Sequence, residues 1–213
     1  MAVDSGKTRL DIGRIVMVPV AAAILLLDVL ALSHRGGDGV WRWPGAILTA
    51  AFYTLIIWGY LRRGPAVATT RSVSARVAAV AATWAPLVIP QLHGAPPGAV
   101  GQGLSDVLLL AGTAWAVWSL RWLGSNLSVI AQARGVSDRG PYHWIRHPLY
   151  AGEIVSALGL AVAAHSLAAA AVWAGFCGLQ VYRALREEQL LLATLPGYRA
   201  YRGRTAALLP GIF

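Results

Sequence analysis

Six apolar stretches divide this chain of 213 residues and limit its fold more than any other feature. They cover residues 12–33, 43–61, 77–92, 104–123, 149–164 and 166–185. Most of them approach the ~20 residues that a helix needs to cross the hydrocarbon layer of a bilayer. The third and fifth are short, and either one could fail to span the layer fully. We therefore expect an all-α, polytopic integral membrane protein with about six transmembrane helices, or five if a short stretch does not span.

The composition agrees with a membrane protein and argues against a nucleic-acid partner. Hydrophobic residues make up 57% of the chain and charged residues 13%, far from the balance of a soluble domain. The net charge of +9 comes from basic residues near the ends of the apolar stretches, where they would face anionic lipid headgroups. No basic stripe is interleaved with aromatic residues on a soluble domain. We expect contacts with membrane lipids, no nucleic acid and no obligate protein partner.

The distribution of basic residues predicts the orientation. If all six stretches span, only Arg35 and Arg42 among the 18 basic residues lie on the side away from the N-terminus, which leaves 16 on the other. Basic residues accumulate in cytoplasmic loops. Both termini are therefore expected in the cytoplasm, and the composition rich in Ala and Arg suggests the inner membrane of a bacterium.

The polar residues of interest lie in the second half of the chain. We divide the chain into N-terminal transmembrane helices (1–123) and a region that would carry the chemistry (124–213). A Gly- and Pro-rich segment, 94–103, predicts a connector between the third and fourth helices. The fifth and sixth stretches predict a helical hairpin that turns near 164–166. Both ends of this hairpin would return to the cytoplasmic side.

This hairpin would bring two polar segments together. The first, Gly140–Tyr150, carries two prolines, two histidines, an arginine and three aromatic residues directly before an apolar run. The second is Arg183–Glu188, which continues the sixth stretch. Charged and aromatic groups that converge at the mouth of a helical hairpin are typical of a small-molecule site.

Pro148 gives this segment a definite local structure. Proline suits the first turn of a helix because it lacks an N–H and fixes φ. Its ring disfavours helical geometry at the preceding His147, which is expected to be extended just outside the helix. The helix would then offer free N–H groups to a ligand carboxylate. Glu187 could accept hydrogen bonds from ribose hydroxyls or an ammonium group, and His143, His147 and His165 lack the spacing of a zinc site.

These residues resemble the isoprenylcysteine carboxyl methyltransferase family, whose members are membrane-embedded enzymes that use S-adenosyl-L-methionine. The resemblance covers about residues 124–213 and lies in the order and spacing of several motifs. The motifs are Gly140-Pro141-Tyr142, then Arg146-His147-Pro148-Leu149-Tyr150-Ala151-Gly152, then Arg183 with Glu187-Glu188, then Tyr198, Tyr201, Arg204 and Pro210. The chain departs from the family pattern at Arg134–Ser137, which lacks an initial histidine, and at Ala206-Ala207, where many relatives have Pro-Arg.

The resemblance implies a cofactor site over the start of the hairpin and a lipophilic methyl acceptor. The implied cofactor contacts are Arg134, Gly135, Val136, Ser137, Tyr142, His147, Pro148, Leu149, Tyr150 and Glu187. Arg183 matches the arginine that faces the acceptor, which we expect to be an isoprenylcysteine-like carboxylate. Such an acceptor needs alignment more than acid–base chemistry, and Arg183 would hold it.

Other acceptors and other functions stay open at this point. If the acceptor is an amine, a base is required, and Glu188 or Glu153 is the candidate. Glu153 lies one turn beyond Tyr150, where a carboxylate is costly unless it has a function. Gly152-Glu153 after the Arg-His-Pro-x-Tyr motif also resembles NADPH-dependent membrane reductases of sterol or enone type. A transporter or binding protein without catalysis is the third alternative, although the sequence shows no inverted repeat of broken helices.

Overall fold

A computed structural model describes residues 11–34 and 42–208 of the chain. Within these residues the fold is all-α, apart from one two-stranded sheet. The α-helices are α1 (Ile12–His34), α2 (Arg42–Arg62), α3 (Val73–Val88), α4 (Ala99–Leu123), α5 (Pro148–Ala164), α6 (Leu167–Thr194) and α7 (Tyr198–Arg204). The 3₁₀-helices are η1 (Ile89–Gln91), η2 (Gly124–Asn126) and η3 (Gly140–His143), and the strands are β1 (Ala68–Thr69) and β2 (Gln132–Ala133).

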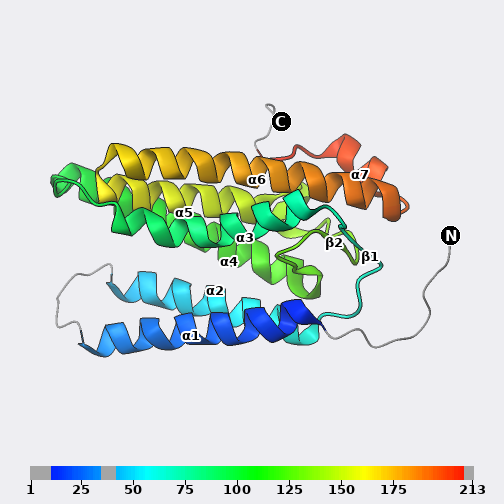
Figure 1. The fold of residues 1–213 in the computed structure, drawn as a ribbon, viewed down its shortest axis with the longest axis horizontal. Coiled ribbons are helices and arrows are strands. Elements are labelled where there is room, and N and C mark those ends of the chain that lie inside the picture. The colour runs from blue at the N-terminus through cyan, green and yellow to red at the C-terminus, as the bar shows by residue number, and fades with distance from the viewer. Residues whose placement is uncertain (1–10, 35–41, 209–213) are drawn as a thin grey trace.

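The six long helices run side by side along the long axis of the molecule (Figure 1). The pair α1 and α2 forms one layer, and α3 to α6 form a bundle beside it. Each predicted apolar stretch corresponds to one of these helices. The strands and α7 gather at one end of the bundle, which we call the site end, and the turn between α5 and α6 lies at the other.

Four of the described helices are long and apolar enough to cross a membrane: Gly13–Leu30, Pro44–Arg62, Val73–Gln91 and Ala99–Asn126. The chain is thus an all-α integral membrane protein. The fifth helix is apolar but has only 17 residues, and the sixth is 28 residues long and carries its charges near the site end. Six full spans stay a prediction.

The prediction for residues 94–103 was wrong at its second half, because α4 already begins at Ala99. Gly98 occupies the N-cap position, and its carbonyl accepts the N–H of Gln102 at 2.9 Å. In a bilayer every backbone polar group needs an internal partner. A helix therefore extends through glycines that would favour a loop in water.

Glycines let α4 and α5 approach each other closely. A Cβ on Gly112 of α4 would lie 2.3 Å from the backbone nitrogen of Ser156, and a Cβ on Gly152 of α5 would lie 2.8 Å from that of Ala116. The indole N–H of Trp115 donates to the carbonyl of Pro148 at 2.9 Å. These contacts fix the start of α5, where the conspicuous motif lies.

The predicted turn between the last two long helices is confirmed. His165 ends α5 in the left-handed conformation, with φ 46° and ψ 45°. Ser166 then caps α6, since its side chain accepts the N–H of Ala169 at 3.1 Å. The hairpin returns the far end of α6 to the start of α5.

The C-terminal segment supports the same motif through its backbone. The N–H groups of Arg146 and His147 donate to the carbonyls of Ala206 and Ala207 at 2.8 and 3.0 Å. Ala206 also donates to the carbonyl of Trp144 at 3.3 Å. The two bonds accepted by the carbonyls need no particular side chain, so the replacement of Pro-Arg by Ala206-Ala207 leaves them in place. Ala206 also supplies an N–H donor that a proline would lack.

Candidate active site

The start of α5 presents an aromatic and imidazole surface. Pro148 is the first helical residue, as predicted, and His147 lies at the N-cap with φ −122° and ψ 55°. The ψ value is lower than that of an extended residue, so this part of the prediction was wrong: the carbonyl of His147 accepts the N–H of Ala151 at 3.1 Å. The rings of His147 and Tyr150 are stacked, with 5.4 Å between their centroids and 3° between their planes.

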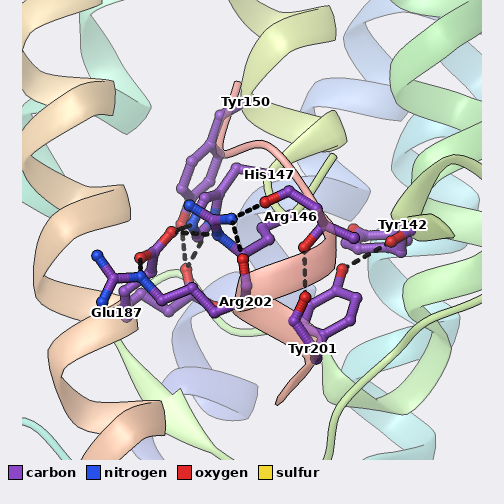
Figure 2. A network of polar contacts seen from close by, with 9 residues as sticks. Tyr142, Arg146, His147, Tyr150, Glu187, Tyr201 and Arg202 are labelled. Carbon is purple, nitrogen blue, oxygen red and sulfur yellow. Dashed lines mark hydrogen bonds and ion pairs between the residues drawn. The ribbon is translucent and has the colours of Figure 1, made fainter. Parts of the chain in front are cut away.

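Glu187 of α6 meets this surface, as the sequence predicted. The hydroxyl of Tyr150 donates to its carboxylate at 2.9 Å, and Nδ1 of His147 lies 3.9 Å from the same oxygen (Figure 2). The side chain of Glu187 is 30% exposed, whereas that of its neighbour Glu188 is 6% exposed. Glu187 therefore keeps capacity to bind a ligand.

The Glu188 carboxylate is the centre of a buried ionic network. It accepts hydrogen bonds from Nε of Arg146 at 2.6 Å and from Nε2 of His147 at 3.3 Å, and it pairs with Nε of Arg202 at 3.0 Å. Burial alone would raise the pKa of Glu188, but the bonds from His147 and Arg146 outweigh it and lower the pKa to about 2. A carboxylate held in this way is a poor proton acceptor near neutral pH. The geometry favours a positioning role for Glu188 over that of a base.

Tyr201 of α7 completes this end of the site. The hydroxyl of Tyr201 in α7 donates to the carbonyl of Tyr142 at 2.7 Å (Figure 2). Burial raises the pKa of Tyr201, so this hydroxyl stays protonated and remains a donor. Arg146 donates to the carbonyls of Arg202 and Thr205, which ties α7 to the motif.

A cavity of about 520 Å³ opens from this polar end into the bundle. Its wall follows α5 along Leu149, Tyr150, Glu153, Ser156 and Leu160, and apolar side chains of α1 to α4 line the remaining sides. The volume lies within the range of small-molecule sites, about 300–1,000 Å³. A ligand with a polar head and a hydrocarbon tail would suit such a cavity.

A chain of polar side chains crosses the wall of this cavity. Arg183 donates to the amide oxygen of Gln180 at 2.8 Å and to the carbonyl of Val129 at 3.2 Å. Gln180 in turn donates to the carboxylate of Glu153 at 2.5 Å. The guanidinium carbon of Arg183 lies 4.7 Å from the centre of the Tyr150 ring. Arg183 and Glu153 thus stand on the cavity wall next to the stacked rings of His147 and Tyr150.

Not all of the predicted cofactor residues lie on this cavity. Tyr142, His147, Leu149, Tyr150 and Glu187 line it, and Pro148 lies directly between two of them. The segment Arg134–Ser137 does not: Arg134 donates to the carbonyl of Gly64, Ser137 donates to that of Trp122, Gly135 packs beside Asn126 and Val136 is exposed. Contacts of this segment with a cofactor stay a prediction.

The structure adds residues for which no role was predicted from the sequence. Gln180 bridges Arg183 and Glu153, and its position three residues before Arg183 was the available signal. Arg202 reaches Glu188 from a different helix, and the carbonyl of Val129 holds Arg183. No local sequence pattern predicts the contact of Arg202 with Glu188 or that of Val129 with Arg183.

Comparisons with known proteins agree with this architecture. The model of the phospholipid methyltransferase family matches residues 102–195, which include most of α4 and all of α5 and α6. The cobalt-zinc-cadmium resistance protein CzcN of Cupriavidus metallidurans is 38% identical over 72 residues, which are 33% of this chain and 33% of that protein. The match thus spans about a third of the length of this curated relative. Over residues 102–195 the chain is therefore similar to the phospholipid methyltransferase family, the same family of membrane-embedded methyltransferases as the isoprenylcysteine carboxyl methyltransferases.

Proposed function

We propose that the protein transfers a methyl group from S-adenosyl-L-methionine to a lipophilic acceptor at the cytoplasmic face of the membrane. The observation that carries this proposal is the shape of the cavity. His147, Tyr150 and Glu187 converge at its polar end, and its apolar part runs between helices of membrane length. A polar cofactor could thus enter from the aqueous phase and a lipophilic acceptor from the bilayer, and the two could meet in the cavity.

The residues at the polar end fit this cofactor. The Glu187 carboxylate can accept hydrogen bonds from hydroxyl or ammonium groups. The first turn of α5 presents backbone N–H groups without intrahelical partners, which suit a carboxylate. The stacked rings of His147 and Tyr150 offer a flat surface beside them. When bound, S-adenosyl-L-methionine supplies a methyl carbon activated by a positive sulfonium.

The chain would contribute alignment and exclusion of water. The contacts of Trp115 with Pro148 and of Arg146 with Glu188 fix the start of α5, so the groups that would hold the cofactor are preorganised. The apolar walls of the cavity would hold the acceptor and keep water from the reacting atoms. Arg183 and Glu153 stand where the acceptor's polar group would lie.

The orientation follows from the same proposal. The site end would face the cytoplasm, because the cofactor is made there and is too polar to cross a bilayer. The 16-to-2 division of basic residues favours this orientation, although part of that count, including Arg35, falls outside the described residues. A bacterial inner membrane with both termini inside is the corresponding localisation.

Calorimetry on detergent-solubilised protein tests the proposal. S-adenosyl-L-methionine and its demethylated product should both bind, and NADPH should not. Glu187→Ala should weaken binding of the product about ten- to hundred-fold, as expected for a hydrogen bond to a charged group worth about 1.5–3 kcal/mol. Gln189→Ala is the matched control, because Gln189 lies two residues further on the same helix and is exposed. Binding of NADPH without either sulfur ligand would instead support a reductase.

A further inference from the structure

We infer that the acceptor enters the cavity as a neutral molecule with a weakly acidic O–H or S–H group, and that Glu153 removes its proton. This inference rests on the proposed function and names the substrate class that the charges of the cavity wall favour. It differs from the carboxylate acceptor that the family resemblance implies.

The position of Glu153 is the first observation. It lines the cavity one turn beyond Tyr150, on the same side of α5. One carboxylate oxygen accepts the bond from Gln180, and the other makes no hydrogen bond within the described part of the chain. A carboxylate among membrane helices is costly unless it serves a function. An oxygen without a partner on the wall of a ligand cavity is placed to accept a proton from the ligand.

The groups on the cavity wall favour a neutral acceptor over a charged one. A carboxylate acceptor would stand among Glu153 and Glu187, and like charges at close range destabilise one another. Arg183 offsets this only in part, because Gln180, Val129 and the Tyr150 ring already engage its guanidinium. An ammonium acceptor would face Arg183 and the positive sulfonium, and although Glu153 and Glu187 would attract it, it has no lone pair with which to attack the methyl carbon. A neutral acceptor avoids both conflicts.

The same groups would assist the reaction of a neutral acceptor. The proton moves from the acceptor's oxygen or sulfur to the free oxygen of Glu153, and the electron pair left behind forms the new bond to the methyl carbon. The bond between that carbon and the sulfonium sulfur breaks and leaves a neutral thioether. Arg183 stabilises the negative charge that develops on the acceptor.

Several titratable groups set the pH dependence of Glu153. Tyr150 lies on the same helix, Arg183 contributes the nearest positive charge from α6, and Tyr53 of α2 and Tyr142 of η3 also interact with it electrostatically. We expect turnover to rise with pH as Glu153 ionises. This rise should vanish in Glu153→Gln.

The test uses four probes with the same dodecyl chain: para-dodecylphenol, dodecanethiol, dodecylamine and tridecanoic acid. Methyl transfer to each is followed by mass spectrometry with detergent-solubilised full-length protein. The phenol or thiol should be the preferred acceptor, and Glu153→Gln should lower its kcat/KM about 10²- to 10⁴-fold, as for loss of a general base. Asp106→Asn is the matched control, because Asp106 also accepts a bond from a glutamine amide but lies outside the cavity wall.

A binding measurement keeps the test independent of turnover. In the presence of the demethylated cofactor, the phenol should bind wild type more tightly than tridecanoic acid does. In Glu153→Gln the difference in affinity between the phenol and the acid should be smaller, because the substitution removes the charge that repels the acid. Tighter binding or faster methylation of the acid or the amine in wild type would overturn the inference while leaving the methyltransferase proposal intact. Failure of the cofactor itself to bind would overturn the proposed function instead.

Discussion

At the scale of single residues, Glu187 and Glu188 show how neighbours on one helix acquire different roles. The paired carboxylates could be recognised in the sequence, but their environments could not. Glu188 is enclosed by Arg146, His147 and Arg202, whereas Glu187 stays partly open to the cavity. Arg202 lies in α7, and no local sequence pattern predicts that α7 packs against this part of α6. Only the structure therefore distinguishes the two carboxylates.

The ionic network around Glu188 predicts a pH dependence of stability. The pKa of Glu188 is lowered from 4.5 to about 2 in the folded protein. Its stabilising contribution is therefore full above about pH 4.5 and is lost as the pH falls toward 2. Glu188→Gln should cost about 3 kcal/mol at neutral pH, as for a broken buried ion pair. This difference in unfolding free energy between wild type and Glu188→Gln should decrease as the pH falls from about 4.5 toward 2.

Thermal unfolding in detergent, measured for wild type and variant across this range, checks the prediction. Asp138→Asn serves as the control, because Asp138 and its partner Arg204 form an exposed pair, which typically contributes at most about 1 kcal/mol. A difference between wild type and Glu188→Gln that does not depend on pH would mean that the network does not hold Glu188 ionised.

At the scale of helices, the sequence predicted the hairpin well and the helix contacts poorly. Pro148, the apolar runs and the turn at His165 gave the start, length and end of α5. The close approach of α4 and α5 depends on Gly112, Gly152 and Gly159, which face the partner helix. Which glycines pack against a neighbour cannot be read from the chain alone, because exposed glycines on α6 have the same local sequence character.

This difference between glycines gives a second prediction. Gly152→Ala would place a methyl group 2.8 Å from backbone atoms of α4, and relief requires α5 to move. Such overpacking costs about 1–3 kcal/mol. Gly175→Ala on α6 is the matched control, because its Cβ meets nothing within 4 Å. Alanine there should stabilise the helix by up to about 1 kcal/mol. Unfolding midpoints of the two variants should therefore move in opposite directions, and equal shifts would refute the packing argument.

At the scale of the whole molecule, the division at residue 124 separates regions that contact each other through polar groups. Arg63, directly after α2, is buried, pairs with Asp11 and donates to the carbonyl of Leu127 at 3.4 Å. The Tyr60 hydroxyl accepts the N–H of Val129 at 3.0 Å, and the carbonyl of Val129 holds Arg183. The end of α2 is thus connected to Arg183, at the proposed acceptor site, through residues 127–129. The sequence explains Arg63 only as one of the basic residues that set the orientation in the membrane. No sequence pattern predicts its contacts with Asp11 and Leu127.

The orientation of the whole molecule can be tested by labelling. Gly98 and Gly203 are both exposed and have open space for a side chain. Gly98 follows the segment that bonds to Ala164 at the end of α5, whereas Gly203 lies in α7 at the site end. In a Cys177→Ala background, cysteine at Gly98 should react with an impermeant reagent on intact cells, and cysteine at Gly203 should react only after lysis. The inverse pattern would place the site end outside, away from the supply of cofactor.

The link from Tyr60 through Val129 to Arg183 predicts that a residue outside the cofactor surface affects the acceptor. Tyr60 is 1% exposed, and Tyr60→Phe keeps its packing while leaving the N–H of Val129 without its partner. Such a loss costs about 1–3 kcal/mol. Because Val129 holds Arg183 and does not contact Glu187, KM for the acceptor should rise several-fold while binding of the demethylated cofactor stays unchanged. Tyr182→Phe, which loses an exposed bond to Ser74, should change neither quantity. Equal losses of acceptor and cofactor binding in Tyr60→Phe would show a general loosening of the fold instead of a specific connection to Arg183.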